Sequence, residues 1–328
     1  MPPFIAYGIG NGLHLPLSCG MEVILIPQFD PNKFDELLLE NKPNHMVGVP
    51  SHYGNIIHSK KLKNEDLSYV IAPTVGGDKM DENLEEETNE FLREHNCEYK
   101  VVKGYGMTEV NAAVAACTSN ETNKIGSVGI PFPNTTISIF DPKTGEELGY
   151  NEKGEVCITG PNTMLGYFNN DEETNKILRK HEDGNVWVHS GDIGYMDADG
   201  NLYIVDRLKR MIIRPDGFKI FPSLIEDVVV KHPLVQSCKV VGLRDFSFSQ
   251  GKLPKVHVVL NETDRNPEAI ENEILMLCEE QLPEYYWPCE IEFNESLPLT
   301  PIGKIDYLKL EKEDYEKQLA ATKKLVKK

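Results

Sequence analysis

Four short clusters in the 328-residue chain combine glycine with hydroxyl, aromatic or charged side chains, the residue types from which nucleotide sites are built. The first is Thr74-Val-Gly-Gly-Asp78. Paired glycines such as Gly76 and Gly77 let the backbone approach a flat ligand closely, although a Gly-Gly pair is more often only a turn. This cluster therefore depends on the other three for a functional interpretation.

The second cluster, Gly104-Tyr-Gly-Met-Thr-Glu109, is more specific because it brings three kinds of chemistry to one predicted strand end. Tyr105 can stack on a base, Thr108 can hydrogen-bond a phosphate, and the Glu109 carboxylate can hold a hard cation. Ligands of open α/β sheets bind at the carboxyl ends of the strands, so the position is suitable. The alternative is a tight strand-to-helix turn.

The remaining two clusters are charged. Trp187-Val-His-Ser-Gly-Asp192 and Asp206-Arg207 together offer a carboxylate and a guanidinium that can bind the hydroxyls of a ribose. As separate surface charges they would contribute little. Pro298-Leu-Thr-Pro-Ile-Gly-Lys304 displays a lysine on a Pro/Gly loop, and loop residues displayed in this way often carry function. A bare solvated lysine is the alternative.

The first part of the chain alternates predicted strands and helices. The opening residues have a strand-like composition, and a helix is predicted at 81–95 because Leu84, Phe91 and Leu92 share one face of an acidic segment. Further strands are predicted at 23–26, 46–50, 70–73 and 99–102. This alternation favours a mostly parallel sheet.

From about residue 120 the pattern changes to short strands separated by turn signals, which predicts a small β-rich, barrel-like part. Its strands are expected at 137–140, 155–158, 194–196 and 202–205. Beyond Asp206-Arg-Leu-Lys209 come a strand at 211–213, a helix with capping-box spacing at Ser223-Leu-Ile-Glu226, strands at 238–242 and 255–260, and a further helix.

We therefore expect an α/β fold in which a partial large domain, a parallel-sheet part followed by the β-rich part, precedes a small α+β C-terminal domain. The expected boundaries are 1–206 for the downstream part of the large domain, divided into 1–118 and 119–206, and 207–328 for a small lid domain.

Composition excludes several classes of function. With 52 Asp+Glu against 34 Lys+Arg the formal net charge is −18, which disfavours nucleic acid or an anionic membrane as the main partner. No apolar run approaches the length of a membrane span. The seven cysteines form no CxxC pair, so neither disulfides nor a zinc site are expected, and a cytoplasmic location is favoured.

The order and the residues of these clusters resemble the motifs of the adenylate-forming superfamily. This superfamily comprises AMP-dependent acyl- and aryl-CoA synthetases, luciferases and peptide-synthetase adenylation domains. Residues 104–109 are similar to its Y-G-x-T-E motif, and GEVCITGPNTMLGYFNN (154–170) resembles its G-E-[LV]-x-[IV]-x-G-P-x-x-M-x-G-Y segment. Residues 190–212 resemble its S-G-D and D-R-x-K blocks, and PLTPIGKID (298–306) its terminal lysine block. The resemblance covers almost the whole chain.

The resemblance implies a site for ATP or AMP and Mg²⁺. The implied nucleotide-binding residues are Gly76, Gly77, Asp78, Tyr105, Gly106, Met107, Thr108, Asp192 and Arg207. In this scheme Tyr105 stacks on the adenine bordered by residues 76–78, while Asp192 and Arg207 bind the ribose. Thr108 touches the phosphates and Glu109 holds Mg²⁺. Both are implied catalytic residues.

Three further roles follow from the resemblance. Lys304 is implied as a catalytic residue that reaches the carboxylate and α-phosphate during adenylation, where a fixed cation stabilises the accumulating negative charge. Lys209 is implied as the hinge between the domains, and Gly217, Phe218 and Lys219 as a wall of the tunnel for the CoA thiol. The hinge would exchange the lysine loop for that tunnel between the half-reactions.

One block of the family is not found. Its phosphate loop, a Ser/Thr/Gly-rich run ending in Gly-x-Pro-Lys, should precede the segment that resembles residues 2–20, so we expect an N-terminally truncated member. Without the loop, adenylation should slow by several orders of magnitude, and the chain should bind AMP or acyl-adenylate better than it makes it. Uncovered sheet edges predict poor solubility or a partner chain that carries the loop.

Three interpretations remain. The first is an ATP-dependent carboxylate–CoA ligase, with a fatty or aromatic acid favoured because Val-Asn-Ala-Ala-Val-Ala-Ala after Glu109 is small and apolar. The second is activation of an acid for a carrier-protein thiol. The third is a non-catalytic or split-gene module that binds AMP or acyl-adenylate together with a partner chain.

Overall fold

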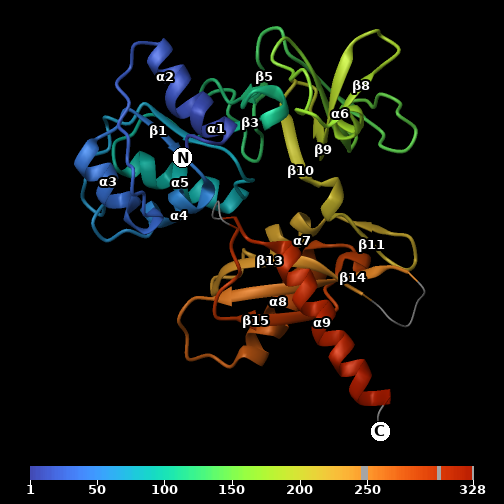
Figure 1. Ribbon diagram of the computed structural model, residues 1–328. Helices are drawn as coiled ribbons and strands as arrows, with labels where there is room; N and C mark the ends of the chain where they lie inside the picture. Colours follow the sequence, from blue (N-terminus) through green and yellow to red (C-terminus); the bar gives the residue numbers. More distant parts are fainter. Residues whose placement is uncertain (245–249, 301–303, 327–328) are drawn as a thin grey trace. The chain divides into compact units, whose positions relative to one another are not determined.

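The computed structural model describes residues 1–244, 250–300 and 304–326 (Figure 1). The chain forms two compact units, Met1–Ile204 and Val205–Lys328, each of which is described by itself. The functional boundaries expected at 118/119 and at 206/207 stay predictions.

The N-terminal unit begins with helix rather than strand. Helix α1 (Ala6–Ile9), the π-helical turn η1 (Gly10–His14) and α2 (Leu15–Ser18) follow one another without a break. The strand predicted at 23–26 is also wrong, because those residues have no regular structure and Leu25 is largely exposed. An apolar run becomes a strand only where a neighbour completes its hydrogen bonds, and no described strand pairs with this one.

A five-stranded sheet with the order β1-β2-β3-β4-β5 forms the centre of this part. Strands β1 (His45–Gly48), β2 (Ala72–Val75) and β3 (Val102–Tyr105) run parallel, while β4 (Ala115–Ala116) and β5 (Ile130–Pro131) are antiparallel additions. The helical elements of this part are η2 (Pro31–Lys33), α3 (Phe34–Asn41), α4 (Pro50–Ile57), α5 (Glu82–Glu94) and η3 (Thr108–Val110). The predicted α/β arrangement is confirmed.

The core of this part explains why the helices sit against the sheet. Tyr53 and Ile56 of α4 and Leu92 of α5 are almost completely buried in one cluster with Met46 and Val75 of the strands. Burial of apolar surface contributes roughly 25 cal/mol per Å², so this cluster stabilises the strand ends that carry the glycine motifs.

The β-rich part is an open sheet with the order β10-β9-β7-β6, and β8 pairs with β9. The elements are β6 (Thr136–Phe140), β7 (Gly154–Thr159), α6 (Asp171–Ile177), β8 (Leu178–Lys180), β9 (Val186–Met196) and β10 (Leu202–Arg207). Within the described ranges the sheet has edges at β6 and β10, so it is not a closed barrel. The strand expected at 194–196 is the end of the much longer β9.

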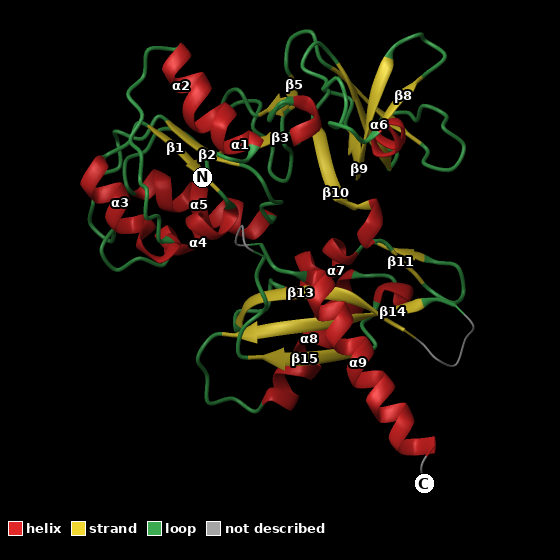
Figure 2. Cartoon of the chain, in the orientation of Figure 1, coloured by secondary structure: helices red, strands yellow, loops and turns green. Residues whose placement is uncertain are grey.

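The C-terminal unit is a three-stranded sheet covered by helices (Figure 2). Its elements are η4 (Leu208–Arg210), β11 (Ile212–Ile213), β12 (Lys219–Ile220), α7 (Pro222–Val229), β13 (Val235–Arg244), β14 (Lys252–Leu260), α8 (Pro267–Gln281), η5 (Glu284–Tyr286), β15 (Glu290–Asn294) and α9 (Tyr307–Val326). The sheet order is β13-β14-β15. The expected α+β C-terminal domain is thus confirmed.

Strand alternation assigns the two faces of this sheet. Val240 and Val258 lie in the core that includes α7 and α8, whereas Val241 and Val259 lie in a second cluster with Leu310 of α9. Successive side chains of a strand point to opposite faces, so the helices must cover both.

The capping box predicted at residues 223–226 is wrong. The N-cap of α7 is Phe221, which makes no side-chain capping hydrogen bond, and Pro222 occupies the first turn. Ser223 instead donates its hydroxyl to the carbonyl of Val205, so this side chain links α7 to β10 rather than capping its own helix.

A search of the described residues finds no helix that is both long and apolar enough to cross a membrane.

Candidate active site

Two of the predicted clusters follow neighbouring parallel strands, so they meet at one edge of the sheet. Residues 76–78 follow β2, and residues 106–108 follow β3. Gly76 donates its N–H to the Gly48 carbonyl at 3.1 Å, and a Cβ on Gly76 would lie 3.1 Å from the Tyr7 ring. Gly77 has φ +79°, and Asp78 is exposed. Glycine is favoured here by a close approach and by backbone conformation.

The turn after β3 requires glycine for a clear steric reason. A Cβ on Gly106 would lie 1.6 Å from the carbonyl oxygen of Ala112, which no side chain can accommodate. The chain passes through η3 and then two left-handed residues, Asn111 with φ 57° and Ala112 with φ 87°, to return as β4. Met107 precedes η3, and Thr108, its first residue, is exposed.

Tyr105 and Asp192 lie in contact although they come from different sheets. The Tyr105 hydroxyl donates to Asp192 Oδ2 at 2.7 Å, and the two residues are only 9% and 3% exposed. A hydrogen bond to a carboxylate is roughly twice as strong as a neutral one. The residues that the family resemblance assigns to adenine and ribose are therefore linked by a hydrogen bond.

Glu109 is held by the segment that follows β7. Tyr167 donates its hydroxyl to Glu109 Oε1 at 2.5 Å, and the Met164 N–H donates to the Glu109 carbonyl at 2.9 Å. Burial, followed by the hydrogen bond to this carboxylate, raises the pKa of Tyr167 to about 12, so the phenol stays protonated and donates. Tyr167 lies in the family-like segment 154–170, but its pairing with Glu109 joins residues 58 positions apart and could not be predicted from the sequence.

A half-buried carboxylate such as Glu109 fits Mg²⁺, which prefers oxygen ligands and commonly takes one or two carboxylates plus water and phosphate oxygens. The Tyr167 bond uses Oε1, and it fixes the orientation of the whole carboxylate.

The other predicted residues belong to the C-terminal unit. Arg207 is exposed at the end of β10, and Lys209 is exposed within η4. Arg207 and Asp192 belong to different units whose relative position is not determined, so their pairing stays a prediction. Asp206 is buried within the C-terminal unit, where it accepts the Ser223 N–H at 2.8 Å and Arg210 Nη1 at 3.2 Å.

Lys304 follows three residues, 301–303, that lie outside the described ranges. Its N–H donates to Thr300 Oγ1 at 3.1 Å, and its carbonyl accepts the Thr300 N–H at 2.7 Å. A β-bridge between Leu299 and Ile305 closes the base of this loop. The main chain of Lys304 is thus well anchored.

The segment predicted to form the thiol tunnel is the tight hairpin between β11 and β12. Gly217 has φ +87° and donates its N–H to the Arg214 carbonyl at 3.0 Å. Phe218 stacks on Tyr285, with ring centroids 4.6 Å apart, and Lys219 starts β12. The hairpin is anchored on the C-terminal unit, and its role in binding CoA stays a prediction.

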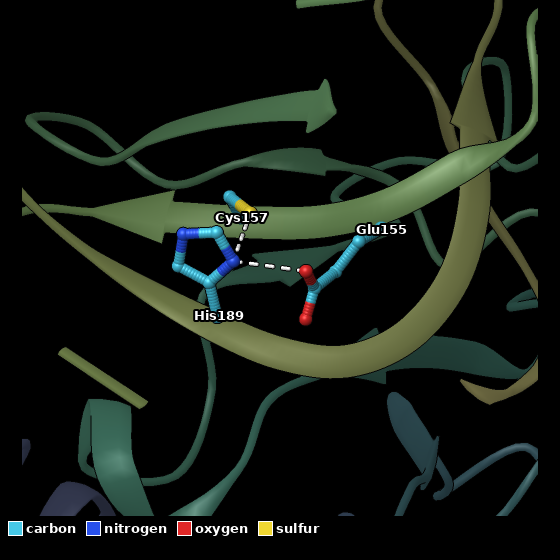
Figure 3. A group of neighbouring side chains, drawn as sticks. All are labelled: Glu155, Cys157 and His189. Atoms are coloured by element: carbon cyan, nitrogen blue, oxygen red, sulfur yellow. Dashed lines mark hydrogen bonds and ion pairs between the residues drawn. The ribbon is translucent and has the colours of Figure 1, made fainter. Parts of the chain in front are cut away.

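Two side-chain groups within the described residues have the composition of a metal site. Glu155, Cys157 and His189 form one, with ligand atoms within 4.8 Å of one another (Figure 3). His257, Glu292 and Asp314 form the other. Neither was predicted, because the members come together only across neighbouring strands and helices.

Both groups are explained by hydrogen bonds. Glu155 uses one carboxylate oxygen for His189 Nδ1 at 2.9 Å and the other for the Gly191 N–H at 3.0 Å. In the second group the Lys255 ammonium already supplies the cation, 2.8 Å from Asp314 Oδ1.

The comparisons with known families cover both units. The family described as "AMP-binding enzyme" matches residues 1–168, and the one described as "AMP-binding enzyme C-terminal domain" matches residues 224–304.

Two curated relatives are named as CoA ligases. The chain is 33% identical over 316 residues to a long-chain-fatty-acid–CoA ligase of Bacillus subtilis, covering 96% of this chain and 54% of the relative. It is 35% identical over 307 residues to a probable 4-coumarate–CoA ligase 1 of Dictyostelium discoideum, covering 93% and 53%. The chain thus spans about half the length of these relatives.

Similar solved structures contain adenine nucleotides. ATP-bound MatB from Rhodopseudomonas palustris matches with a TM-score of 0.83 and 25% identity, over 95% of this chain and 59% of that one. The o-succinylbenzoate-CoA synthetase of Bacillus subtilis, in complex with its acyl-adenylate intermediate, matches with a TM-score of 0.77 and 27% identity, also over 95% and 59%.

Proposed function

The chain belongs to the AMP-binding enzyme family of adenylate-forming enzymes, and from this premise we propose that it activates a carboxylic acid for transfer to the thiol of CoA. In the first step a carboxylate oxygen attacks the α-phosphorus of ATP, and pyrophosphate leaves. In the second step the CoA sulfur attacks the acyl carbon, and AMP leaves with the bonding electrons.

One observation carries this proposal: the hydrogen bond between Tyr105 and Asp192. It links two residues 87 positions apart in sequence, each expected to bind a different part of one nucleotide. Tyr105 is the last residue of β3, at the sheet edge where ligands of α/β folds bind. A carboxylate whose orientation is already fixed by a hydrogen bond loses less conformational entropy when it binds a ligand.

The reacting phosphates need positive charge. Mg²⁺ on Glu109 would offset the charge of the phosphates, and Lys304 would stabilise the negative charge that accumulates at the α-phosphate. Thr108, exposed at the start of η3, would donate its hydroxyl to a phosphate oxygen. Lys209 is proposed as the hinge and residues 217–219 as the tunnel wall for the CoA thiol.

The choice of acid and acceptor rests on relatives. Those cited above are named for a long-chain fatty acid and for 4-coumarate, which supports a fatty or aromatic acid and CoA as acceptor over a carrier-protein thiol. In the structure the small residues after Glu109 form β4 and core, with Val114 and Ala115 fully buried, so they give no independent support for the acid class. A cytoplasmic location stays part of the proposal, in keeping with seven cysteines, all among the described residues, that form no disulfide.

The decisive experiment measures binding and turnover on the same protein. Calorimetry should detect AMP binding. Pyrophosphate release should require ATP and the acid together, and release of AMP with formation of the thioester should require CoA as well. Asp192→Asn should weaken AMP binding, whereas Asp199→Asn, which removes an exposed carboxylate from a turn of the same part, should not. Absence of AMP binding to the unsubstituted protein would contradict the proposal.

A second candidate is a non-catalytic module that binds AMP or acyl-adenylate with a partner chain carrying the phosphate loop. The apolar side chains exposed on the N-terminal segment favour it, with Phe4 80%, Leu17 60% and Leu25 67% exposed. Exposed apolar patches commonly mark interaction surfaces. AMP binding without pyrophosphate release would support this candidate over the first, provided that pyrophosphate release appears when a polypeptide carrying the phosphate loop is added in trans.

A further inference from the structure

Asp192 lies on an irregular stretch of β9. Cys157 of β7 pairs with His189 and Glu155 pairs with Ile193, so only Val156 stands opposite the three residues 190–192. Such a bulge interrupts the ladder and redirects side chains. In this sheet it turns the Asp192 carboxylate toward the Tyr105 hydroxyl.

The bulge leaves backbone groups that ordinary strand pairing would satisfy, and two side chains supply the missing partners. Ser190 donates its hydroxyl to the Val156 carbonyl at 2.6 Å and accepts the Asp192 N–H at 3.0 Å. Gly191, with φ +69°, donates its N–H to Glu155 Oε1 at 3.0 Å. An N–H that is shielded from water and lacks an acceptor destabilises the fold, so the Glu155 oxygen stabilises this backbone conformation.

Glu155 is itself held in place by His189 (Figure 3). The second oxygen, Oε2, lies 2.9 Å from His189 Nδ1, and His189 Nε2 lies 2.9 Å from His181 Nε2. Glu155 and His189 are both buried. Burial raises the pKa of the Glu155 carboxyl, but the bond from His189, its charge and the Gly191 N–H together bring this pKa below its ordinary value, so the carboxylate stays ionised.

We propose that Glu155, oriented by His189, is a positioning residue that fixes the bulge at residues 190–192 and thereby sets the affinity of Asp192 for the nucleotide ribose. We call the hydrogen-bonded pair of Glu155 and His189 the brace. The inference rests on the proposed function, because the expected effect of the brace is on AMP binding. Cys157 is the natural contrast: it lies beside His189, with Sγ 3.5 Å from Nδ1, but holds no backbone group of the bulge.

The test compares three variants in the full chain. Glu155→Ala removes the acceptor of the Gly191 N–H, Glu155→Gln restores an acceptor oxygen of similar shape, and Cys157→Ala truncates a buried neighbour without touching the bulge. Calorimetry should find AMP binding weakened about tenfold or more in E155A, the equivalent of one hydrogen bond to a charged group. E155Q should recover most of the affinity, and C157A should keep it.

Amide hydrogen exchange over residues 186–196 supplies a readout that does not depend on AMP. E155A should accelerate exchange at Gly191 and Asp192, while C157A should leave these amides protected. If E155A fails to fold, E155Q combined with His189→Gln replaces it, since that pair preserves volume but disturbs the orientation of the carboxylate.

The outcomes separate the inference from the proposed function. If the unsubstituted protein does not bind AMP, the proposed function fails, while the exchange data still test the brace. If it binds AMP and E155A binds as tightly as C157A, the inference is overturned. One equivalent of zinc in the purified protein, lost in C157A, would also overturn it in favour of a metal centre.

Discussion

The Tyr105 hydroxyl offers the sharpest test of the site. Tyr105→Phe keeps the ring and removes only the group that donates to Asp192 at 2.7 Å. Because Asp192 is 3% exposed, water cannot readily replace the lost donor. A hydrogen bond to a charged group contributes about 1.5–3 kcal/mol to stability, so the N-terminal unit should be destabilised by about that amount.

Tyr53→Phe is the matched control. Its hydroxyl donates to the Thr74 carbonyl at 2.9 Å, and the residue is fully buried in the same unit. A neutral hydrogen bond of this kind is worth about 1 kcal/mol. The free-energy loss on Tyr105→Phe should therefore be about twice the loss on Tyr53→Phe.

Urea unfolding can be followed in the N-terminal unit alone. The chain has two tryptophans, and Trp287→Phe leaves Trp187 of β9 as the sole tryptophan. The slope of the free energy against urea should not change between variants, because neither substitution alters the surface that unfolding exposes. The reasoning is refuted if Tyr105→Phe costs no more than Tyr53→Phe, or if its cost is unchanged in an Asp192→Asn background.

Three further predictions follow from the site and its supports. Gly106→Ala should prevent folding of the N-terminal unit, since its Cβ would lie 1.6 Å from a backbone oxygen; normal circular dichroism and cooperative melting would contradict this. Burial raises the pKa of Asp197, but hydrogen bonds led by that from Lys124 lower it to about 2 from 3.8, so its stabilisation is present above pH 4 and is lost as pH falls toward 2. Asp197→Asn should flatten thermal stability against pH in that window, and an unchanged curve would be contrary to expectation. Tyr167→Phe frees the Glu109 carboxylate to rotate, so the Mg²⁺ concentration needed for half-maximal ATP binding should rise several-fold while AMP binding without Mg²⁺ stays the same; a parallel loss of both would indicate a merely structural role.

Local sequence patterns predicted the elements whose structure depends on local chemistry. The helix predicted at 81–95 is α5, and Asp81 at its start accepts the Leu84 N–H at 2.9 Å as the N-cap. Asn266 likewise caps α8. Gly106 is needed because its own turn allows no Cβ. These features depend on residues close in sequence, so a short sequence pattern is enough to predict them.

Patterns failed where partners distant in sequence decide the outcome. The apolar run at 23–26 lacks a neighbouring strand among the described residues, and Ser223 bonds Val205 rather than capping its helix. The brace of Glu155 and His189 depends on the register between β7 and β9, which no spacing within either strand reveals. The role of Tyr167 could not be predicted for the same reason, because its partner Glu109 lies 58 positions away.

The sequence by itself determined the family and the α/β class, and it named the residues predicted to bind a nucleotide, because glycine, hydroxyl and charged side chains follow one another in a fixed order at strand ends. Only the tertiary structure decided that Tyr105 and Asp192 are hydrogen-bonded, that Tyr167 orients Glu109, and that Glu155 binds the backbone of the bulge that carries Asp192. The physical reason is that the type of a side chain sets which bonds it can make, whereas its position is set by contacts between strands that only folding brings together.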